Sequence, residues 1–180
     1  MLKAKANVIR LLSVVLVIGG VLAAIGLGLE NKNTNKAEAS VVKQLPAFDA
    51  PDLLDPNTRV TQQDFLISDY KLLNVWASWC GSCLSEHAFL KNLAQQGVPI
   101  YGLNYRDESR AATRYLQQHG NPFVKVAQDP QGSVALDLGV IGTPETYLIN
   151  SAGEIVFKYS GQLTQEKWQR YFQAYFKQES

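Results

Sequence analysis

The two cysteines of this chain stand between an apolar run and a helical pattern. Residues 72–77, Leu-Leu-Asn-Val-Trp-Ala, indicate a buried strand, and residues 84–94 indicate a helix. Cys80 and Cys83 therefore lie where a strand leads into the first turn of a helix. A Cys-x-x-Cys pair in that position is the layout of a dithiol redox site.

Three other uses of a cysteine pair compete with the redox interpretation. Structural zinc takes four ligands, and only His87 and His119 remain, in the wrong arrangement. Covalent haem attachment needs Cys-x-x-Cys-His, but Leu84 occupies the histidine position. A purely structural disulfide over so short a loop constrains little of the unfolded chain. We therefore expect a redox-active disulfide between Cys80 and Cys83, with no metal and no other cofactor.

The position of each cysteine predicts its role. Unpaired backbone N–H groups and the helix dipole favour a thiolate at Cys80, which we expect to be exposed and to attack a substrate disulfide. Cys83, one turn further in, is expected to be buried and to resolve the mixed disulfide. Trp79 is expected to flank the site as an apolar surface. Glu86 follows Cys83 by three residues and shares roughly one helix face with it, so its carboxylate is placed to exchange a proton with that thiol.

The N-terminal region indicates a membrane anchor. Residues 11–29 are almost entirely apolar or small, and 19 residues come close to the roughly 20 that span a bilayer as a helix. Basic residues within 1–10 favour a cytoplasmic N-terminus with the rest of the chain exported. The alternative is a cleaved signal peptide, whose apolar region is usually shorter, about 7–15 residues. We predict a cytoplasmic N-terminus at 1–10 and a transmembrane signal anchor at 11–29.

The remainder divides into a tether and one domain. Residues 30–44 are mostly polar or small and predict a flexible tether, so the domain is expected at 45–180. Its hydrophobic content of 46% suits a globular protein, and a net charge of +1 gives no case for binding nucleic acid. Asp107 is predicted to cap a helix that ends at His119. Apolar spacing predicts a last helix over 168–176.

Strands and helices alternate early in this domain, and a hairpin plus a helix closes it. The hairpin strands are expected at 145–150 and 154–159. This order predicts an α/β fold, a central mixed β-sheet with helices on both faces. It is also the order of a thioredoxin-like fold.

Residues 79–83 resemble the active-site motif of the thioredoxin superfamily. In that superfamily a cis-proline faces the dithiol, and Thr143-Pro144 matches its place. The resemblance implies that Thr143, Pro144 and Trp79 bind substrate. Glu145 follows this proline, so we expect it and Glu86 to make the site a mild reductant and not a strong oxidant.

Longer stretches resemble the DsbE/CcmG family of cytochrome c biogenesis. They are residues 74–80, Glu86-His87, 97–107, 120–122 and 137–146. The resemblance implies a reductase tethered to the bacterial inner membrane, with its catalytic domain in the periplasm. Such proteins keep the Cys-x-x-Cys-His cysteines of apocytochrome c reduced, directly or through a CcmH-type partner. Their electrons come from a membrane protein of the DsbD or CcdA type.

One departure and several alternatives remain. Family members often carry proline between the cysteines, where this chain has Gly81 and Ser82, two positions that help to set the redox potential. A related anchored reductase of the ResA/TlpA type with other substrates is the nearest alternative. A peroxide-reducing enzyme would carry its cysteine in a different local motif. A non-catalytic thioredoxin-like module would usually lose a cysteine, and this chain keeps both.

Overall fold

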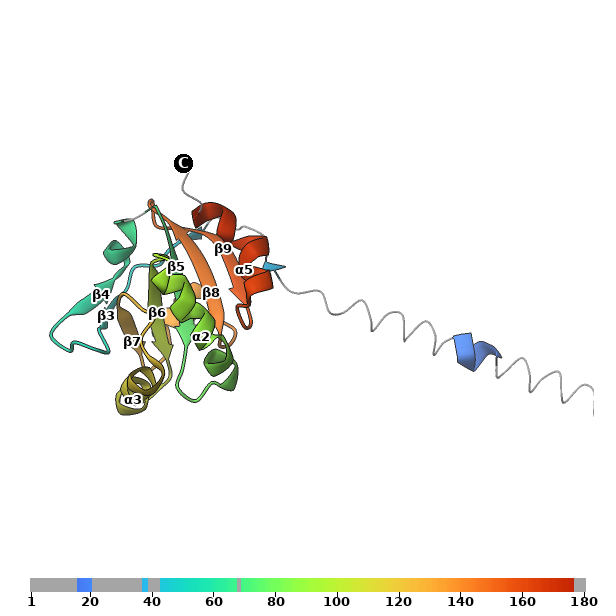
Figure 1. Cartoon of the computed structure of the whole chain (residues 1–180), viewed down its shortest axis with the longest axis horizontal. Helices are drawn as coiled ribbons and strands as arrows, with labels where there is room; N and C mark the ends of the chain where they lie inside the picture. The colour runs from blue at the N-terminus through green and yellow to red at the C-terminus, as the bar shows by residue number, and fades with distance from the viewer. Residues whose placement is uncertain (1–15, 21–36, 39–42, 68, 177–180) are drawn as a thin grey trace, which may run out of the picture. The chain divides into compact units, whose positions relative to one another are not determined.

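The structure is a computed structural model that describes residues 16–20, 37–38, 43–67 and 69–176 (Figure 1). The chain divides into two units, residues 1–36 and residues 37–180. In the first unit, residues 16–20 form a short piece of helix. The rest of the expected anchor, and the expected cytoplasmic segment 1–10, lie outside the described residues. Within the described ranges, no helix has both the length and the apolar character needed to cross a membrane.

A mixed β-sheet forms the centre of the second unit. Its described strands are β1 (Ala37–Glu38), β2 (Lys43–Gln44), β5 (Tyr70–Trp76), β6 (Ile100–Tyr105), β7 (Val126–Asp129), β8 (Glu145–Asn150) and β9 (Glu154–Ser160). Their order is β1-β9-β8-β5-β6-β7, and β2 also pairs with β9. β5 runs parallel to β6 and antiparallel to β8. Two short pieces of the expected tether, β1 and β2, therefore extend the sheet.

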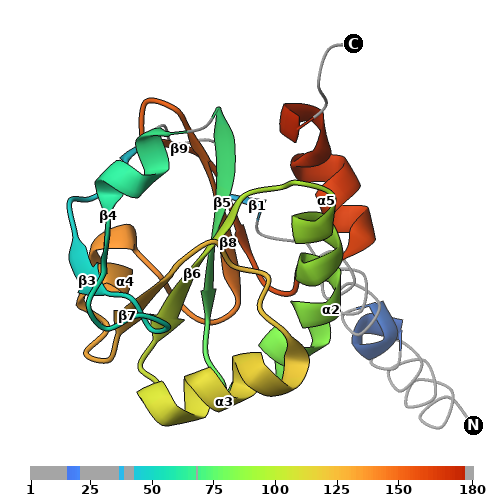
Figure 2. The ribbon, with the colours of Figure 1, turned by 60° about the vertical axis from the view of Figure 1, so that its left-hand side comes forward.

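The other elements cover both faces of this sheet. They are the hairpin β3 (Asp49–Pro51) and β4 (Arg59–Thr61), the 3-10 helices η1 (Gln62–Leu66) and η2 (Gln173–Phe176), and the helices α2 (Gly81–Gln95), α3 (Ser109–His119), α4 (Ser133–Leu138) and α5 (Gln165–Tyr171). In Figure 2, α2 and α5 lie on one side of the sheet, whereas α4 and the β3–β4 hairpin lie on the other. This arrangement confirms the predicted mixed sheet with helices on both faces.

Alternation along the strands builds a separate core on each face. Leu72, Trp76 and Leu148 point to the side of α2, α3 and α5. Leu73, Val75 and Tyr147 point to the side of η1 and α4. Because neighbouring residues of a strand face opposite sides, burial of both sides explains the unbroken apolar run that marked β5.

One prediction about helices holds only in part, and another is wrong. The last helix is α-helical only to Tyr171, and the chain leaves helical geometry at Phe172 (φ −122°) before a turn of 3-10 helix. Phe172 is fully buried, so its packing outweighs the continuation of a regular helix. Asp107 does not cap α3, because Glu108 occupies the cap position and makes no side-chain capping bond. The Asp107 carboxylate is instead bonded to Ser78, in the loop before the cysteines.

Candidate active site

The two cysteines form a disulfide at the start of α2. The S–S bond joins Cys80 and Cys83, whose Cα atoms are 5.3 Å apart. Cys80 occupies the N-cap position, and its Sγ accepts the backbone N–H of Cys83 at 3.1 Å. This N–H belongs to the first turn of the helix, where backbone donors lack helical partners and favour negative charge. The structure thus places the sulfur of Cys80 where a thiolate would be stabilised.

The exposure of the cysteines differs from the prediction. Cys80 is 7% exposed and Cys83 is 3% exposed, so both are buried in the disulfide form. The disulfide ties the Cys80 sulfur to the buried sulfur of Cys83, which accounts for the small difference between them. Trp79, directly before the pair, is 60% exposed, as expected for an apolar surface beside the dithiol.

The peptide bond between Thr143 and Pro144 is cis, as the resemblance implied. Pro144 directly precedes β8, and Glu145 is the register partner of Val75 near the end of β5. The chain then runs from β5 through residues 77–79 to Cys80. Pro144 directly precedes β8, and the disulfide follows β5. Because these two adjacent strands run antiparallel, both groups lie at the same end of the sheet. Ile141, in the loop before the proline, is 76% exposed.

Glu86 is a buried acid on the same helix as the disulfide. Its side chain is 1% exposed. Its Oε1 accepts the Asn74 Nδ2–H at 2.9 Å, and its Oε2 accepts the backbone N–H of Leu163 at 2.6 Å. Burial raises the pKa of Glu86 to about 7, although these two hydrogen bonds act to lower it. A carboxyl group with that pKa is poised to take up or give a proton at neutral pH.

The surroundings of Glu86 come from several elements. The Asn74 Nδ2 group also donates to Thr146 Oγ1 at 3.2 Å, which joins β5 to β8. Tyr115, on α3, is buried, and burial followed by the charge of Glu86 raises its pKa to about 12. His87 is 4% exposed, and its Nε2 lies 2.7 Å from the carbonyl oxygen of Gly120. His87 is therefore a core histidine bonded to the main chain.

Glu145 does not join Glu86, contrary to the predicted pair of carboxylates beside the dithiol. It lies one residue from Thr146 on β8, so strand alternation turns it to the face of η1 and α4. Its carboxylate accepts from Tyr147 Oη at 2.8 Å and from Ser160 Oγ at 3.0 Å, and lies 3.3 Å from the Lys158 ammonium. Of the two carboxylates expected to make the site a mild reductant, only Glu86 therefore lies on the α2 face of the sheet.

The same contacts give Glu145 a place in the loop before Pro144. Its Oε1 accepts the backbone N–H of Ile141 at 3.2 Å. The Lys158 ammonium, its ionic partner, donates to the carbonyl of Gly139 at 2.9 Å. Two backbone groups of residues 139–144 are thus held by one partly buried ion pair. The structure assigns Glu145 to the support of this loop.

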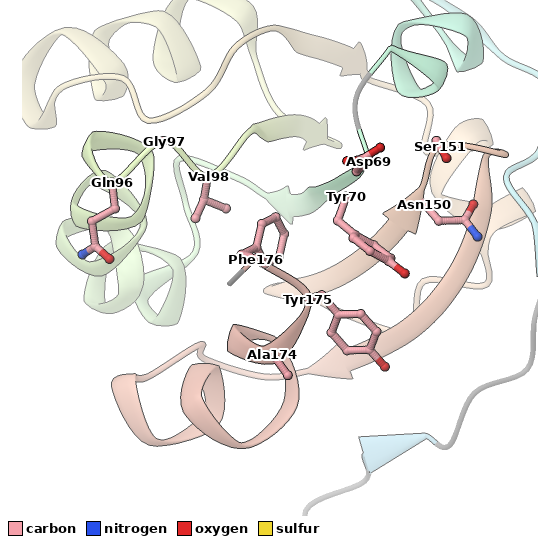
Figure 3. A pocket seen from close by; sticks show the side chains of 10 residues that line it. All are labelled: Asp69, Tyr70, Gln96, Gly97, Val98, Asn150, Ser151, Ala174, Tyr175 and Phe176. Carbon is pink, nitrogen blue, oxygen red and sulfur yellow. The ribbon is translucent and has the colours of Figure 1, made fainter. Parts of the chain in front are cut away.

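A hollow of about 1150 Å³ lies away from these residues (Figure 3). It is lined by Tyr70 at the start of β5, by residues 96–98 after α2, and by the turn after β8, with the rings of Tyr175 and Phe176 from the C-terminal segment. The disulfide follows the other end of β5 and opens the other end of α2. The hollow therefore belongs to the opposite end of the domain and takes no part in the dithiol site.

Comparison with known proteins identifies the chain's relatives. Residues 40–173 match the Redoxin family. The probable thiol:disulfide interchange protein DsbE-2 of Pasteurella multocida is 49% identical over 152 residues, which cover 84% of this chain and 80% of that protein. The chain is a DsbE-type member of the Redoxin family. The thiol:disulfide interchange protein DsbE of Pseudomonas aeruginosa is 44% identical over 140 residues, which cover 78% of this chain and 77% of that protein.

A solved structure agrees with this DsbE-type assignment in its fold. The putative thiol:disulfide interchange protein DsbE from Chlorobium tepidum matches with a TM-score of 0.66 at 24% identity, over 77% of this chain and 99% of that one. The fold is thus thioredoxin-like, as predicted. The relatives and the Cys80–Cys83 pair together make the protein a thiol:disulfide oxidoreductase.

Sequence reasoning missed several residues that support the DsbE-type site. Asn74 carried a signal, since a lone amide inside an apolar strand needs a polar partner when buried. Ser78 and Asp107 carried none, because they lie 29 residues apart and meet only through the fold. Lys158 looked like the polar member of an alternating strand, and only the structure pairs it with Glu145.

Proposed function

We propose that this protein reduces disulfides during cytochrome c maturation, and that it does so on the outer side of the bacterial inner membrane. The observation that carries the proposal is the buried Glu86 carboxyl group beside a disulfide on the same helix. With a pKa of about 7 the Glu86 carboxyl group is partly ionised at neutral pH, and its negative charge disfavours a permanent thiolate, which suits a reductant more than a strong oxidant. The relatives are named as thiol:disulfide interchange proteins, which supports disulfide exchange at this pair.

The reaction begins with the dithiol form. The Cys80 thiolate attacks one sulfur of the substrate disulfide, so a Cys80–substrate bond forms and the first substrate thiolate leaves. Cys83 then gives its proton to the Glu86 carboxylate and attacks the Cys80 sulfur. The second substrate thiolate leaves, and the protein is left with the Cys80–Cys83 disulfide. Two electrons have passed to the substrate.

Residues around the disulfide would present the substrate chain. Trp79 offers an exposed ring before Cys80, and Thr143 and Pro144 offer backbone at the same end of the sheet. The substrate we propose is the Cys-x-x-Cys-His segment of apocytochrome c, or the cysteine pair of a CcmH-type protein that serves it. A DsbD- or CcdA-type membrane protein would return the electrons. A membrane anchor at 11–29 would hold the domain in the periplasm.

The alternative is an anchored reductase of the ResA/TlpA type with other substrates. Partner capture separates the two. Cys83→Ala in the full chain removes the resolving thiol, so Cys80 should accumulate as a mixed disulfide with its substrate. Mass spectrometry of the captured protein should then find an apocytochrome c or a CcmH-type protein. Cys80→Ala in the same cells is the matched control and should capture neither.

The outcome is decisive in both directions. Capture of other periplasmic proteins, with neither cytochrome c nor a CcmH-type protein among them, would overturn the cytochrome assignment in favour of the alternative. Loss of the gene should also abolish mature c-type cytochromes in aerobic cells that lack a second reductase. Normal cytochromes in such cells would contradict the proposal.

A further inference from the structure

The loop that leads to Cys80 is joined to a neighbouring loop by the carboxylate of Asp107. Residues 77–79 link the end of β5 to Cys80. Within this link, the backbone N–H of Ser78 donates to Asp107 Oδ2 at 2.5 Å, and the Ser78 hydroxyl donates to Asp107 Oδ1 at 2.8 Å. Asp107 stands between β6 and α3, so the two loops are joined across the end of the sheet.

Two further donors complete the set around Asp107. Its Oδ2 accepts Asn104 Nδ2–H at 3.0 Å, and its Oδ1 accepts the backbone N–H of Glu108 at 2.9 Å. A carboxylate accepts about four hydrogen bonds, two on each oxygen, and here each oxygen receives two. Hydrogen bonds to an ionised acceptor are also stronger than neutral ones.

An amide of the same shape would fail at this position. The side chain of asparagine has one accepting oxygen and one donating nitrogen. If its nitrogen replaced Oδ2, it would face the N–H of Ser78; if it replaced Oδ1, it would face the N–H of Glu108. In either orientation one backbone donor loses its acceptor. The site thus requires a carboxylate and not merely a polar side chain.

Arg106, the residue before Asp107, has an uncommon backbone conformation and adds another hydrogen bond between the two loops. Arg106 has a φ of +45°, in the left-handed region that residues other than glycine rarely adopt. Its carbonyl oxygen accepts the indole N–H of Trp79 at 3.0 Å. The Trp79 ring, with Ala111 and Pro130, lines a groove of about 490 Å³ next to the loop before Cys80. Arg106 and Asp107 thus hold the Trp79 ring and Ser78, the two residues that precede Cys80.

We propose that Asp107 is a positioning residue for dithiol–disulfide exchange. It fixes Ser78 and Trp79 and thereby holds Cys80 against Cys83 in the oxidised protein. The inference rests on thiol exchange at Cys80, which the proposed function also needs, but not on the identity of the protein substrate.

Loss of the Asp107 carboxylate should favour the dithiol over the disulfide for two reasons. The disulfide form needs the two cysteines held together, whereas the dithiol form does not, so a looser loop favours the dithiol. Asp107 binds Ser78, two residues before Cys80, so removal of its negative charge also favours the Cys80 thiolate. The looser loop and the lost negative charge both make the disulfide of an Asp107 variant easier to reduce.

The test is an equilibrium titration with glutathione, which needs no protein substrate. For Asp107→Asn we expect the equilibrium constant to move by about threefold to tenfold toward the dithiol, equal to about 15–30 mV for a two-electron couple. Asp107→Glu, which keeps the charge, should recover part of the shift. Ser78→Ala removes only one of the bonds and should shift the equilibrium in the same direction by less. Asp137→Asn, at an exposed position of α4, is the matched control and should leave it unchanged.

Thermal unfolding of both redox forms separates positioning from simple support of the fold. A positioning residue stabilises the disulfide form more than the dithiol form, so Asp107→Asn should lower the Tm of the oxidised protein more. Equal losses in both forms, with a glutathione constant within threefold of the parent, would overturn the proposal. If Asp107→Asn does not fold, the Ser78→Ala titration decides, and no shift in it refutes the inference. The cytochrome assignment would stand in either case, because only partner capture tests it.

Discussion

Replacing Glu86 with glutamine should remove a large part of the pH dependence of the oxidised protein's stability. The side chain is 1% exposed, and burial raises its pKa from 4.5 to about 7. At 1.36 kcal/mol per pH unit, this rise corresponds to about 3 kcal/mol. Because the folded pKa lies above the unfolded one, protonation of Glu86 favours the folded state. That contribution is complete below about pH 4.5 and is lost as the pH rises through about 7.

Glutamine is a suitable mimic of the protonated acid at this position. Its carbonyl oxygen can accept the N–H of Leu163, which now binds the carboxylate. Its amide nitrogen then faces Asn74. Among the described residues Asn74 Oδ1 has no hydrogen-bond donor, so rotation of the Asn74 amide presents that oxygen to the new N–H group. The substitution therefore removes the charge without leaving the Leu163 donor unpaired.

Urea denaturation of the oxidised protein between pH 4.5 and 8.5 measures this effect. The free energy of unfolding of Glu86→Gln, relative to the parent protein, should rise by about 2–3 kcal/mol over that range. Glu166→Gln is the matched control, because that side chain is 73% exposed on α5. Parallel curves for Glu86→Gln and the parent, within about 0.5 kcal/mol, would refute the reasoning about the buried acid.

Three further predictions concern neighbouring residues. Asn74→Ala removes a donor that lowers the pKa of Glu86, so the pH at which stability falls should move upward, as the same denaturation series would detect. Glu145→Gln removes the carboxylate charge 3.3 Å from the Lys158 ammonium and should lower the free energy of unfolding by about 1–3 kcal/mol in urea denaturation. Ile141→Ser, at a 76% exposed position, should change stability by less than about 0.5 kcal/mol and slow the reduction of protein disulfides, but not of glutathione disulfide. A destabilised or equally active Ile141→Ser protein would contradict that prediction.

Local pattern was sufficient for the elements on which the dithiol depends. The apolar run of β5 followed by Cys80 defined a strand that leads into a helix, and alternation on both sides of residues 150–153 defined the β8–β9 hairpin. These features are local, since strand period and turn residues act over a few positions. The cis bond before Pro144 was foreseen from resemblance alone, because most X–Pro bonds are trans.

The errors arose where a distant contact outweighed a local preference. Asp107 precedes a helix and suits a cap, but Ser78 offers it two donors from a loop 29 residues away. Glu145 is adjacent in sequence to Pro144, yet strand alternation turns its carboxylate to the face of Lys158. Sequence proximity predicted a shared site for Glu145 and Glu86, whereas the pleat of β8 separates them.

The reduction potential of the Cys80–Cys83 pair at pH 7 decides whether this dithiol is poised as a reductant. Equilibration of the protein with glutathione buffers, followed by thiol labelling, gives this potential. With a buried acid on the dithiol helix, we predict a mild to moderate reductant, between about −180 and −270 mV. A potential near −120 mV, typical of a strong disulfide oxidant, would contradict it.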